Sequence, residues 1–595
     1  MQLQQLRAVL LESATLAAPQ LRQVRGDLSA SAINLVQYLA LRQRDQRALQ
    51  EQLSASGLSS LGRSESHALA QVDAVLGLLA QLLGEERPGS DEAISASQGQ
   101  ALLHEHAERL LGPSPRKRRQ RVMVTLPSEA AASPEYVQAL VAAGMDIARI
   151  NSAHDDPAAW RAMARNVRHA SARLDRRCLI AVDLAGPKLR TGAIEPGPEV
   201  IKLKPTRNVW GEVLHPARAW LTSGPSALVP ALPIRETFLD RLRVGDKLKL
   251  RDARGRRRKF VVESITDGAV EVSCDRTTYI RRGTRIHGAD DAAMVGHLAR
   301  CEQHILLKEG DLLALDRSGK PGHPARIHGA SALATISCEP EGVLDMIHEG
   351  ESVWFDDGRI GGLVEQVEPG RTLVRITSAR PEGEKLRSGK GINLPDGELP
   401  LPALTGEDRV ALAFAVEAAD LVQFSFVRTP EDVHGLQDAL AELGRPDLPV
   451  VLTIETRQGF ERLPELLLAA MRSGPPSVMI ARGDLAVECG PSRLSELQEE
   501  ILWLCEAAHV PVIWATQVLE RLAKEGRPSR AEITDAAMGE RAECVMLNKG
   551  RHLPLAVRTL DDILRRMRQH QQKKRSMLRA LRVAGPPREQ APVAA

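Results

Sequence analysis

From residue 122 onward, short apolar runs alternate with amphipathic stretches, and this alternation is the feature that most constrains how the chain can fold. Each run is long enough for one buried strand, and the stretches between them have the period of helices. Such alternation is typical of parallel β/α architecture. The apolar runs cover residues 122–127, 145–151, 178–184, 420–426, 449–455, 477–484, 511–517 and 544–550.

Polar residues end five of these runs at spacings of 28, 31, 32 and 32 residues. Successive βα units of a barrel repeat at about this length, and their strand ends converge on one face. An open doubly wound sheet could hold four such units, but no GxGxxG motif follows the first strand. The sequence therefore predicts an α/β protein built on a (β/α)8 TIM barrel. The five residues are Ser425, Thr453, Asp484, Thr516 and Asn548.

The remaining sequence predicts two additions to the barrel. An N-terminal segment repeats Leu and Ala at three- and four-residue intervals, as an all-α extension does. A Gly- and Arg-punctuated segment with β-like runs predicts an inserted β-rich domain. The predicted order is a helical extension (1–112), a basic linker (113–121), the first part of the barrel (122–195), the inserted domain (196–352), the second part of the barrel (353–565) and a basic tail (566–595).

Charge is balanced overall and concentrated locally. The chain has 79 Lys and Arg against 76 Asp and Glu, a formal charge of +3, which excludes a protein whose whole surface binds a polyanion. Five of the six residues at 116–121 are basic. We interpret this run and the basic tail as solvated segments rather than as sites for RNA or a membrane.

Cysteine usage and hydropathy point to the cytoplasm. The seven cysteines include no CxxC pair, which indicates neither a disulfide framework nor a structural zinc site. The longest apolar stretches, 35–41 and 72–84, are shorter than the roughly 20 residues that span a bilayer. The N-terminal residues lack the features of a secretory signal. We expect a cytoplasmic protein with no membrane partner.

Two carboxylates end neighbouring strands of the predicted barrel. Glu455 and Asp484 would face one cavity, and oxygen ligands of this kind suit Mg²⁺ or Mn²⁺ with positions left for substrate oxygens. Helix capping or salt bridges are the alternative roles. Arg149 lies at the end of the second strand and Arg190 follows the third, after Gly-Pro-Lys; there a guanidinium could bind a carboxylate or phosphate, or form a surface ion pair. Gly483 would bring helix-start amides close to an anion.

Collinear motifs support a closer comparison. They are AGMDIARINSAH, DLAGPKLRTG, DDG, GKGINLP, LPALTGEDRVAL, QFSFVRTPEDV, VMIARGDLAVE, PVIWATQVLERL and GRPSRAEITDAA. In order and spacing they closely resemble the pyruvate kinase family over about 122–560, most weakly across 196–350. The resemblance implies a (β/α)8 barrel whose inserted domain closes over the active site as a lid. It also implies the glycolytic transfer of phosphate from phosphoenolpyruvate to ADP, which gives pyruvate and ATP.

The resemblance assigns roles to individual residues. They are catalytic roles for Arg149, Arg190, Thr453 and Thr516, substrate binding by Ala481, Arg482, Gly483 and Thr516, nucleotide binding by Asn151 and His154, and Mg²⁺ or Mn²⁺ ligation by Glu455 and Asp484. These roles amount to positioning and charge neutralisation, which phosphoryl transfer requires.

One departure from the family removes a charge. Thr453 stands where the family has a lysine beside the transferring phosphoryl group. Losing a preorganised cation in a dry site costs on the order of 3 kcal/mol, or about a hundredfold in rate. Either Lys549 or Lys188 substitutes for it, or the kinase reaction is weak.

The family's K⁺ site is also altered. Asn151 and Asp183 remain, but Ala153 and Leu184 replace residues that would supply hydroxyl oxygens. Lys188 stands where the family commonly has an acidic residue, and its ammonium can supply the charge of a bound K⁺. We therefore expect that K⁺ is not required. We also expect a homo-oligomer, no specific nucleic-acid partner, and no C-terminal regulatory domain of the kind usual in the family.

Two other functions remain open. A Mg²⁺-dependent carbon–carbon lyase or aldolase acting on a 2-oxo acid would use the same carboxylates to stabilise an enolate, and Thr453 would impair that chemistry less. A non-catalytic interaction protein is the third reading, but a scaffold has no physical need for two carboxylates beside arginines.

Overall fold

The computed structural model describes residues 1–85, 93–115, 118–224, 228–266, 268–289, 291–325, 333–340, 342–397 and 401–568. The predicted basic tail lies almost entirely outside the described residues. Two compact units make up the chain. The barrel unit contains Met1–Leu189, Asp345–Val364 and Gly391–Ala595, and the inserted unit contains Arg190–Leu344 and Glu365–Lys390.

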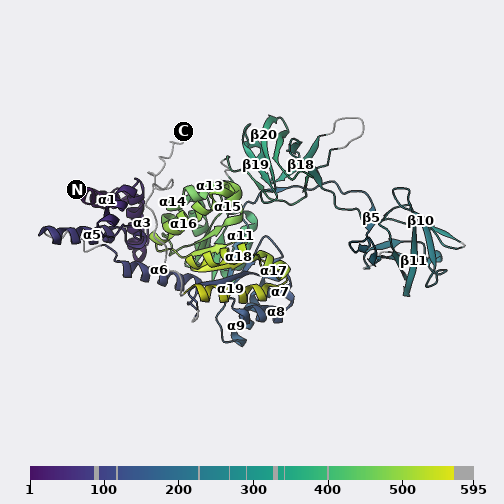
Figure 1. Ribbon diagram of the computed structural model, residues 1–595, viewed down its shortest axis with the longest axis horizontal. Coiled ribbons are helices and arrows are strands. Elements are labelled where there is room, and N and C mark those ends of the chain that lie inside the picture. Colours follow the sequence, from purple (N-terminus) through teal and green to yellow (C-terminus); the bar gives the residue numbers. More distant parts are fainter. Residues whose placement is uncertain are drawn as a thin grey trace. The chain divides into compact units, whose positions relative to one another are not determined.

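A closed barrel of parallel strands forms the centre of the barrel unit, which confirms the predicted fold class (Figure 1). Nearly every strand residue is buried, because side chains inside the barrel pack on each other and those outside pack under helices. In barrel order the strands are β1 (Arg121–Thr125), β2 (Ile147–Asn151), β3 (Leu179–Leu184), β24 (Leu421–Phe424), β25 (Val450–Ile454), β26 (Ser477–Ala481), β27 (Val512–Ala515) and β28 (Cys544–Leu547).

Helices follow the strands in the predicted alternation. They are α7 (Glu129–Ala132), α8 (Pro134–Ala143), α9 (Pro157–Arg173), α11 (Gly406–Ala418), α12 (Pro430–Glu442), α13 (Arg457–Glu461), α14 (Leu463–Ala470), α15 (Arg482–Cys489), α16 (Leu494–Ala507), α17 (Glu520–Glu525), α18 (Arg530–Met538) and α19 (Leu553–Met567). Several begin at a side-chain cap, as Thr405, Thr429 and Ser529 do for α11, α12 and α18. Such caps satisfy the free amides of the first helical turn.

The N-terminal segment is helical, as the sequence predicts, and it packs on the barrel. Its helices lie beside α14 and α16 (Figure 1), and Leu35 and Leu41 share one apolar cluster with Leu497 and Ile501 of α16. The guanidinium of Arg42 lies 4.7 Å from the ring centroid of Trp503. The helices are α1 (Gln2–Leu16), α2 (Ala18–Leu21), α3 (Ser29–Arg42), α4 (Arg47–Ala55), α5 (Ala68–Leu83) and α6 (Ala96–Leu111).

The last residues of α6 close the floor of the barrel. Leu110 and Leu111 belong to the same buried cluster as Met123, Ile147 and Ile513, which point into the barrel from the first halves of their strands. The N-terminal helices therefore complete the interior of the barrel as well as covering its outside.

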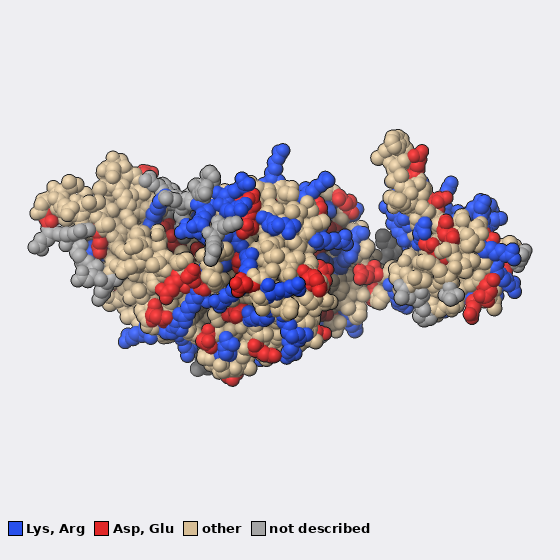
Figure 2. Space-filling model, turned by 90° about the horizontal axis from the view of Figure 1, so that it is seen from below, with Lys and Arg blue, Asp and Glu red and all other residues tan. Residues whose placement is uncertain are grey.

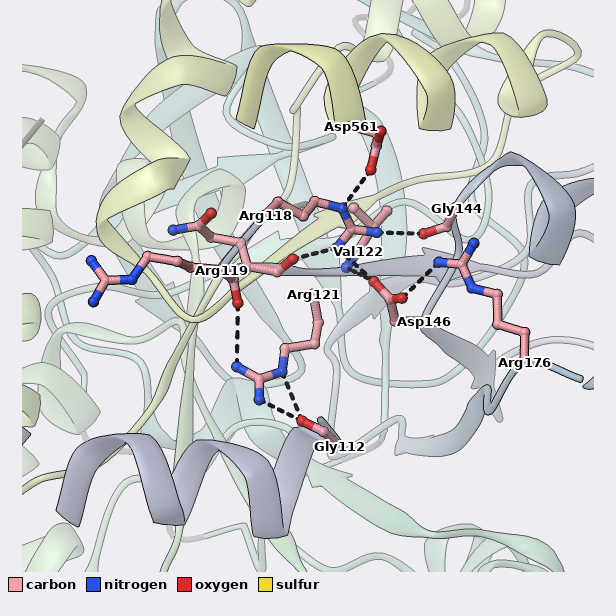
Figure 3. A network of polar contacts seen from close by, with 10 residues as sticks. Gly112, Arg118, Arg119, Arg121, Val122, Gly144, Asp146, Arg176 and Asp561 are labelled. Carbon is pink, nitrogen blue, oxygen red and sulfur yellow. Dashed lines mark hydrogen bonds and ion pairs between the residues drawn. The ribbon is translucent and has the colours of Figure 1, made fainter. Parts of the chain in front are cut away.

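The prediction of a solvated linker is wrong for its last residues, since Arg118, Gln120 and Arg121 are buried, whereas Pro113 and Arg119 are exposed. Arg118 is 1% exposed and its Nε donates to Asp561 of α19 at 2.7 Å, while its Nη1 lies 2.7 Å from Asp146 (Figure 3). Arg121 is 2% exposed and donates to the carbonyl of Gly112 at 2.9 Å. These arginines link the end of α6, the first two strands and the last helix. Residues 116–117 lie outside the described residues.

The inserted unit contains mainly antiparallel sheets, in which β8 and β9, and β17 and β18, pair in parallel. Its larger sheet has the strand order β15-β14-β10-β11-β12-β8-β9, and a second group pairs β4, β18, β17 and β21. The bounds are β4 (Arg190–Thr191), β8 (Ala217–Thr222), β9 (Ala231–Pro233), β10 (Lys247–Arg251), β11 (Arg257–Thr266), β12 (Ala269–Cys274), β14 (Arg285–His287), β15 (Ala292–Met294), β17 (Leu312–Asp316), β18 (Ala334–Glu339) and β21 (Arg371–Ser378).

The predicted return to the barrel at residue 353 is too early. Residues 352–393 form further strands outside the barrel, including β19 (Ser352–Phe355), β20 (Ile360–Glu368) and β23 (Ile392–Asn393). The barrel itself resumes with β24. Segment 365–390 belongs to the inserted unit, so the chain enters that unit twice.

The visible face of the N-terminal helices carries few charged side chains compared with the rest of the barrel unit (Figure 2). Glu65–Leu83 has the length and apolar composition of a membrane-crossing helix, with a mean hydropathy of 1.3. Its Leu69, Val72 and Val75 are buried in the apolar cluster that also contains α1 and α3. Core helices of soluble proteins have the same composition.

Candidate active site at the barrel mouth

Arg149 is held by three polar groups inside the mouth of the barrel. It lies on β2, and its Nη2 donates to Asp183 of β3 at 2.6 Å. Its Nε donates to Gln423 at 2.8 Å and its Nη1 donates to Thr125 at 2.9 Å. Burial raises the pKa of Asp183, and the adjacent guanidinium partly opposes that rise. Two of the predicted site residues, Arg149 and Asp183, are therefore in direct contact.

The predicted nucleotide residues lie on the loop that follows β2. Asn151 accepts the backbone N–H of Ala153 at 2.9 Å through its Oδ1. His154 is exposed, and its backbone N–H donates to the carbonyl of Asn151 at 3.2 Å. The side chain of Trp160 donates to the carbonyl of His154 at 2.8 Å and fixes the loop against α9.

Glu455 and Asp484 interact with each other and with one ammonium group. Glu455 is 6% exposed, and its Oε1 accepts the N–H of Phe426 at 2.6 Å. Burial raises the pKa of Glu455 to about 8, and the negative charge of Asp484 adds to the rise. Asp484 Oδ1 lies 3.3 Å from Lys188 Nζ. Asp484 lies in α15 and not at a strand end as predicted, because β26 ends at Ala481.

Lys188 carries the positive charge of this group. Burial alone would lower its pKa, but Asp484, Glu455 and Asp357 outweigh that effect and raise it. Three acids around one ammonium leave excess negative charge for a further cation. No cluster of three or more His, Cys, Asp or Glu in a metal-binding arrangement occurs among the described residues. Mg²⁺ binds through one or two carboxylates, water and substrate oxygens, so the donor atoms of Glu455 and Asp484 fit such an ion.

Residues predicted to bind the substrate form the turn between β26 and α15. The N–H of Gly483 donates to Thr516 Oγ1 at 2.9 Å, and Thr516 has a left-handed φ of 60°. The side chain of Arg482 points elsewhere: it donates to the carbonyl of Ala515 at 2.8 Å and pairs with Asp535 at 2.9 Å. Any contribution of Arg482 to substrate binding would therefore come from its backbone.

Thr453 lies on β25, two residues before Glu455, and so on the same side of the strand. It is 4% exposed, and among the described residues its Oγ1 has no hydrogen-bond partner. Of the two candidate replacement cations, Lys188 lies against the carboxylates and Lys549 lies nearer Arg149. Burial lowers the pKa of Lys549, Asp155 raises it and Arg149 lowers it further.

Arg190 belongs to the inserted unit, where it opens β4 and donates to the carbonyl of Gly389 at 3.3 Å. It is not among the residues that the barrel unit brings together. Its predicted role in phosphoryl transfer remains a prediction.

Several neighbours of the site were not predicted. Gln423 and Thr125 hold Arg149, and Asp357 acts on Lys188. The sequence contains one signal for Gln423, which is a polar residue within an otherwise apolar strand run. A cavity of about 320 Å³ is lined by residues that include Pro187, Phe426, Thr456, Arg457 and Glu488. Glu455 and Asp484 do not line it, although Phe426 donates its N–H to Glu455.

Comparison with known proteins identifies the family. The family model for the barrel domain of pyruvate kinase matches residues 117–279 and 295–551. The pyruvate kinase of Naumovozyma castellii is 35% identical over 227 residues, which are 37% of this chain and 44% of that protein. The pyruvate kinase of Hypocrea jecorina is 35% identical over 209 residues (35% of this chain, 37% of that protein).

Pyruvate kinase PKLR of Rattus norvegicus is 31% identical over 217 residues, which are 36% of each chain. The chain thus matches less than half the length of these relatives. The family model, in contrast, covers well over half of the chain, which therefore belongs to the pyruvate kinase family.

Proposed function

We propose that the protein transfers a phosphoryl group from phosphoenolpyruvate to ADP and so produces pyruvate and ATP. The observation that carries the proposal is the group of Glu455, Asp484 and Lys188 in the same barrel unit as the anchored guanidinium of Arg149. Phosphoryl transfer depends on positioning and on neutralising charge, and this group offers both.

Glu455 and Asp484 would hold Mg²⁺, which would supply positive charge to the enolate and phosphoryl oxygens. The residues of the chain act around that site. Arg149 is oriented by three hydrogen bonds, so its guanidinium need not reorganise when negative charge develops on the phosphoryl group. Thr516 would contact the bound three-carbon unit; the hydrogen bond that its hydroxyl accepts from Gly483, at the start of α15, supports this role.

Lys188 is the better candidate for the charge that Thr453 does not provide. Its ammonium lies at the carboxylates that would hold the metal, whereas burial and Arg149 make the charged form of Lys549 less favourable. We propose that Lys188 supports the transferring group from the carboxylate side.

A coupled assay of the full chain with phosphoenolpyruvate, ADP and Mg²⁺ tests the proposal. Wild type should form pyruvate and ATP, and Asp484→Asn should lose activity by a hundredfold or more, as expected when an electrostatic contact to the transition state is removed. Thr453→Lys should raise kcat if the missing ammonium limits the rate. Wild type and Thr453→Lys both forming no ATP would refute the kinase function.

The unpartnered hydroxyl of Thr453 supports a second candidate, a lyase or aldolase that acts on a 2-oxo acid. Enolate chemistry needs the carboxylates and their metal but not a cation at 453. Cleavage of 2-oxo acids by wild type without phosphate transfer from phosphoenolpyruvate would favour this function over the kinase.

We also propose that the reaction does not require K⁺. Asp183, which would bind K⁺, is already paired with Arg149 at 2.6 Å and accepts the hydroxyl of Ser425 at 3.2 Å. Lys188 contacts Asp484 rather than Asp183, so its charge acts at the carboxylate pair. Replacing tetramethylammonium chloride by KCl at constant ionic strength should leave the rate unchanged, and strong activation would contradict the proposal.

A further inference from the structure

One face of the larger sheet in the inserted unit carries basic side chains that have no acidic partners among the described residues. Strands β14, β10 and β11 are neighbours, and they bury Leu248, Leu250, Phe260 and Ile286 on one side. Since side chains alternate along a strand, the residues between these point to the other side. That outward side, the basic face, consists of Lys247, Lys249, Arg251, Arg257, Lys259, Arg285 and His287, all exposed.

Pairing between the strands sets like charges directly opposite each other. Lys249 faces Lys259 across β10 and β11, and Arg251 faces Arg257. On its other side Lys249 faces His287 of β14. Like charges in directly opposed positions destabilise a sheet. Such an arrangement costs folding free energy unless an anion neutralises it.

Acidic residues of the unit do not relieve this charge. Among the described residues, none of the seven side chains of the basic face is in an ion pair. Arg254 and Arg258, from the same stretch of sequence, are in contrast neutralised by Asp252, with nitrogen–oxygen distances of 2.8 and 3.5 Å. Arg254 also stacks at 4.4 Å on Tyr279. Arg254 and Arg258 therefore have a carboxylate partner, whereas the seven side chains of the basic face have none among the described residues; Arg251 donates only to the carbonyl of Gly255, at 3.2 Å.

The spacing of the basic side chains and the residues around them indicate which kind of anion the face could bind. Cations at alternate positions of a strand lie about 6.6 Å apart, and neighbouring strands are about 4.8 Å apart, so the face is a regular two-dimensional array. A protein partner would need an apolar centre, and an aromatic platform would be needed to stack bases. Among the described residues of these strands, the outward side carries no Phe, Tyr or Trp side chain, and its apolar residue is the half-buried Val261 opposite Lys247; the exposed Ile265 is paired with the buried Val270 near the end of β11. An anion on this face would therefore be held by its charge alone. A repeating row of phosphates matches the array.

We propose that the basic face binds the phosphate backbone of a single-stranded nucleic acid without reading its sequence. Contacts to phosphates alone give binding that is independent of sequence and strongly dependent on salt. The proposal is therefore compatible with the expectation of no specific nucleic-acid partner. It is also independent of the chemistry at the barrel mouth.

Fluorescence anisotropy of a labelled oligouridylate with the full chain, over a series of salt concentrations, tests this proposal. Each neutralised phosphate contributes about −0.7 to the slope of log K against log salt for a single strand. The double variant Lys249→Gln/Lys259→Gln should therefore bind about tenfold more weakly at low salt, with a slope shallower by about 1.4. Its thermal unfolding midpoint should not fall, since a repulsive pair has been removed.

A matched control removes the same charge from the barrel unit. Arg173 of α9 and Arg409 of α11 are exposed, and Arg173→Gln/Arg409→Gln should leave both affinity and slope unchanged. Equal losses in the two double variants, or no loss in either, would overturn the proposal. Tight binding to phosphatidylserine vesicles or polyglutamate without binding to the oligouridylate would also overturn it.

Discussion

At the scale of one residue, Thr453 shows that replacing the family's lysine leaves a buried hydroxyl in the site. A lysine at this position would direct an ammonium toward the site, whereas the threonine leaves a buried hydroxyl with no partner among the described residues. A buried polar group without a hydrogen bond costs about 1–3 kcal/mol. The position therefore reduces stability as well as removing a charge.

Thr453→Val keeps the shape of the side chain and removes this hydroxyl. We expect the free energy of unfolding to rise by about 1 kcal/mol, because no hydrogen bond is lost. Ser425→Ala is the matched comparison, since the Ser425 hydroxyl donates to Asp183 at 3.2 Å, and we expect it to lower the free energy of unfolding by about 1 kcal/mol. Urea denaturation measures both changes. A loss in Thr453→Val as large as that in Ser425→Ala would contradict the prediction.

Individual residues also show which parts of the site could be predicted from the sequence and which could not. The types and order of Arg149, Asp183 and Glu455 at strand ends were sufficient to predict a charged barrel mouth. The contact of Lys188 with Asp484 was not predictable, because the two residues are 296 positions apart, one in the loop after β3 and the other in the first turn of α15. Asp484 itself was placed on a strand because an apolar run and the first turn of a buried helix look alike in sequence.

At the scale of elements, the segment between α6 and β1 holds several elements together through the buried Arg118. A run of basic residues predicts a solvated segment when each charge is considered alone. The partners of Arg118 lie far along the chain, and Asp561 is 443 residues away. Only the closed fold brings these carboxylates to the arginine, so local composition could not predict its burial.

Arg118→Met should be strongly destabilising. The variant removes the guanidinium that Asp146 and Asp561 share, but Asp146 keeps Arg176 at 2.8 Å and the Asp561 side chain is 32% exposed. We therefore expect a loss of about 3 kcal/mol, at the lower end of the cost of breaking a buried charged group. Arg119 is exposed, and Arg119→Met should change the free energy of unfolding by less than about 0.5 kcal/mol. Equilibrium unfolding in urea compares the two variants, and similar values would show that the Arg118 contacts contribute little.

At the scale of the whole molecule, the N-terminal helices are joined to the barrel through a buried histidine. His509 follows α16, and its ring nitrogens lie 2.9 Å from Ser31 Oγ and 2.9 Å from the carbonyl oxygen of Ser66. His106 of α6 donates to the carbonyl of His509 at 2.7 Å. The pKa of His509 is lowered to about 4, mainly by burial; the hydrogen bond to Ser66 opposes this shift and the nearby His106 contributes to it.

This histidine predicts a loss of stability in mild acid. Between an unfolded pKa of about 6.5 and a folded pKa of about 4, the unfolded chain binds the proton and the folded chain does not. Stability contributed by His509 is therefore complete above about pH 6.5 and falls by an amount on the order of 3 kcal/mol as the pH approaches 4.

Thermal unfolding across this pH range measures the effect. His509→Gln should show a shallower pH dependence than wild type, whereas His169→Gln, which alters an exposed histidine, should match wild type. Equal pH dependence in all three proteins would show that His509 does not link the pH to unfolding.

The floor formed by Leu110 and Leu111 has a practical consequence for anyone who divides this protein. The match to the family begins at residue 117, so a truncation designed from the alignment would discard α6. Such a fragment would expose the lower barrel interior to water and would be prone to precipitate during purification. Recombinant work on catalysis should therefore retain the residues up to the end of α6 at Leu111, although the family match does not include them.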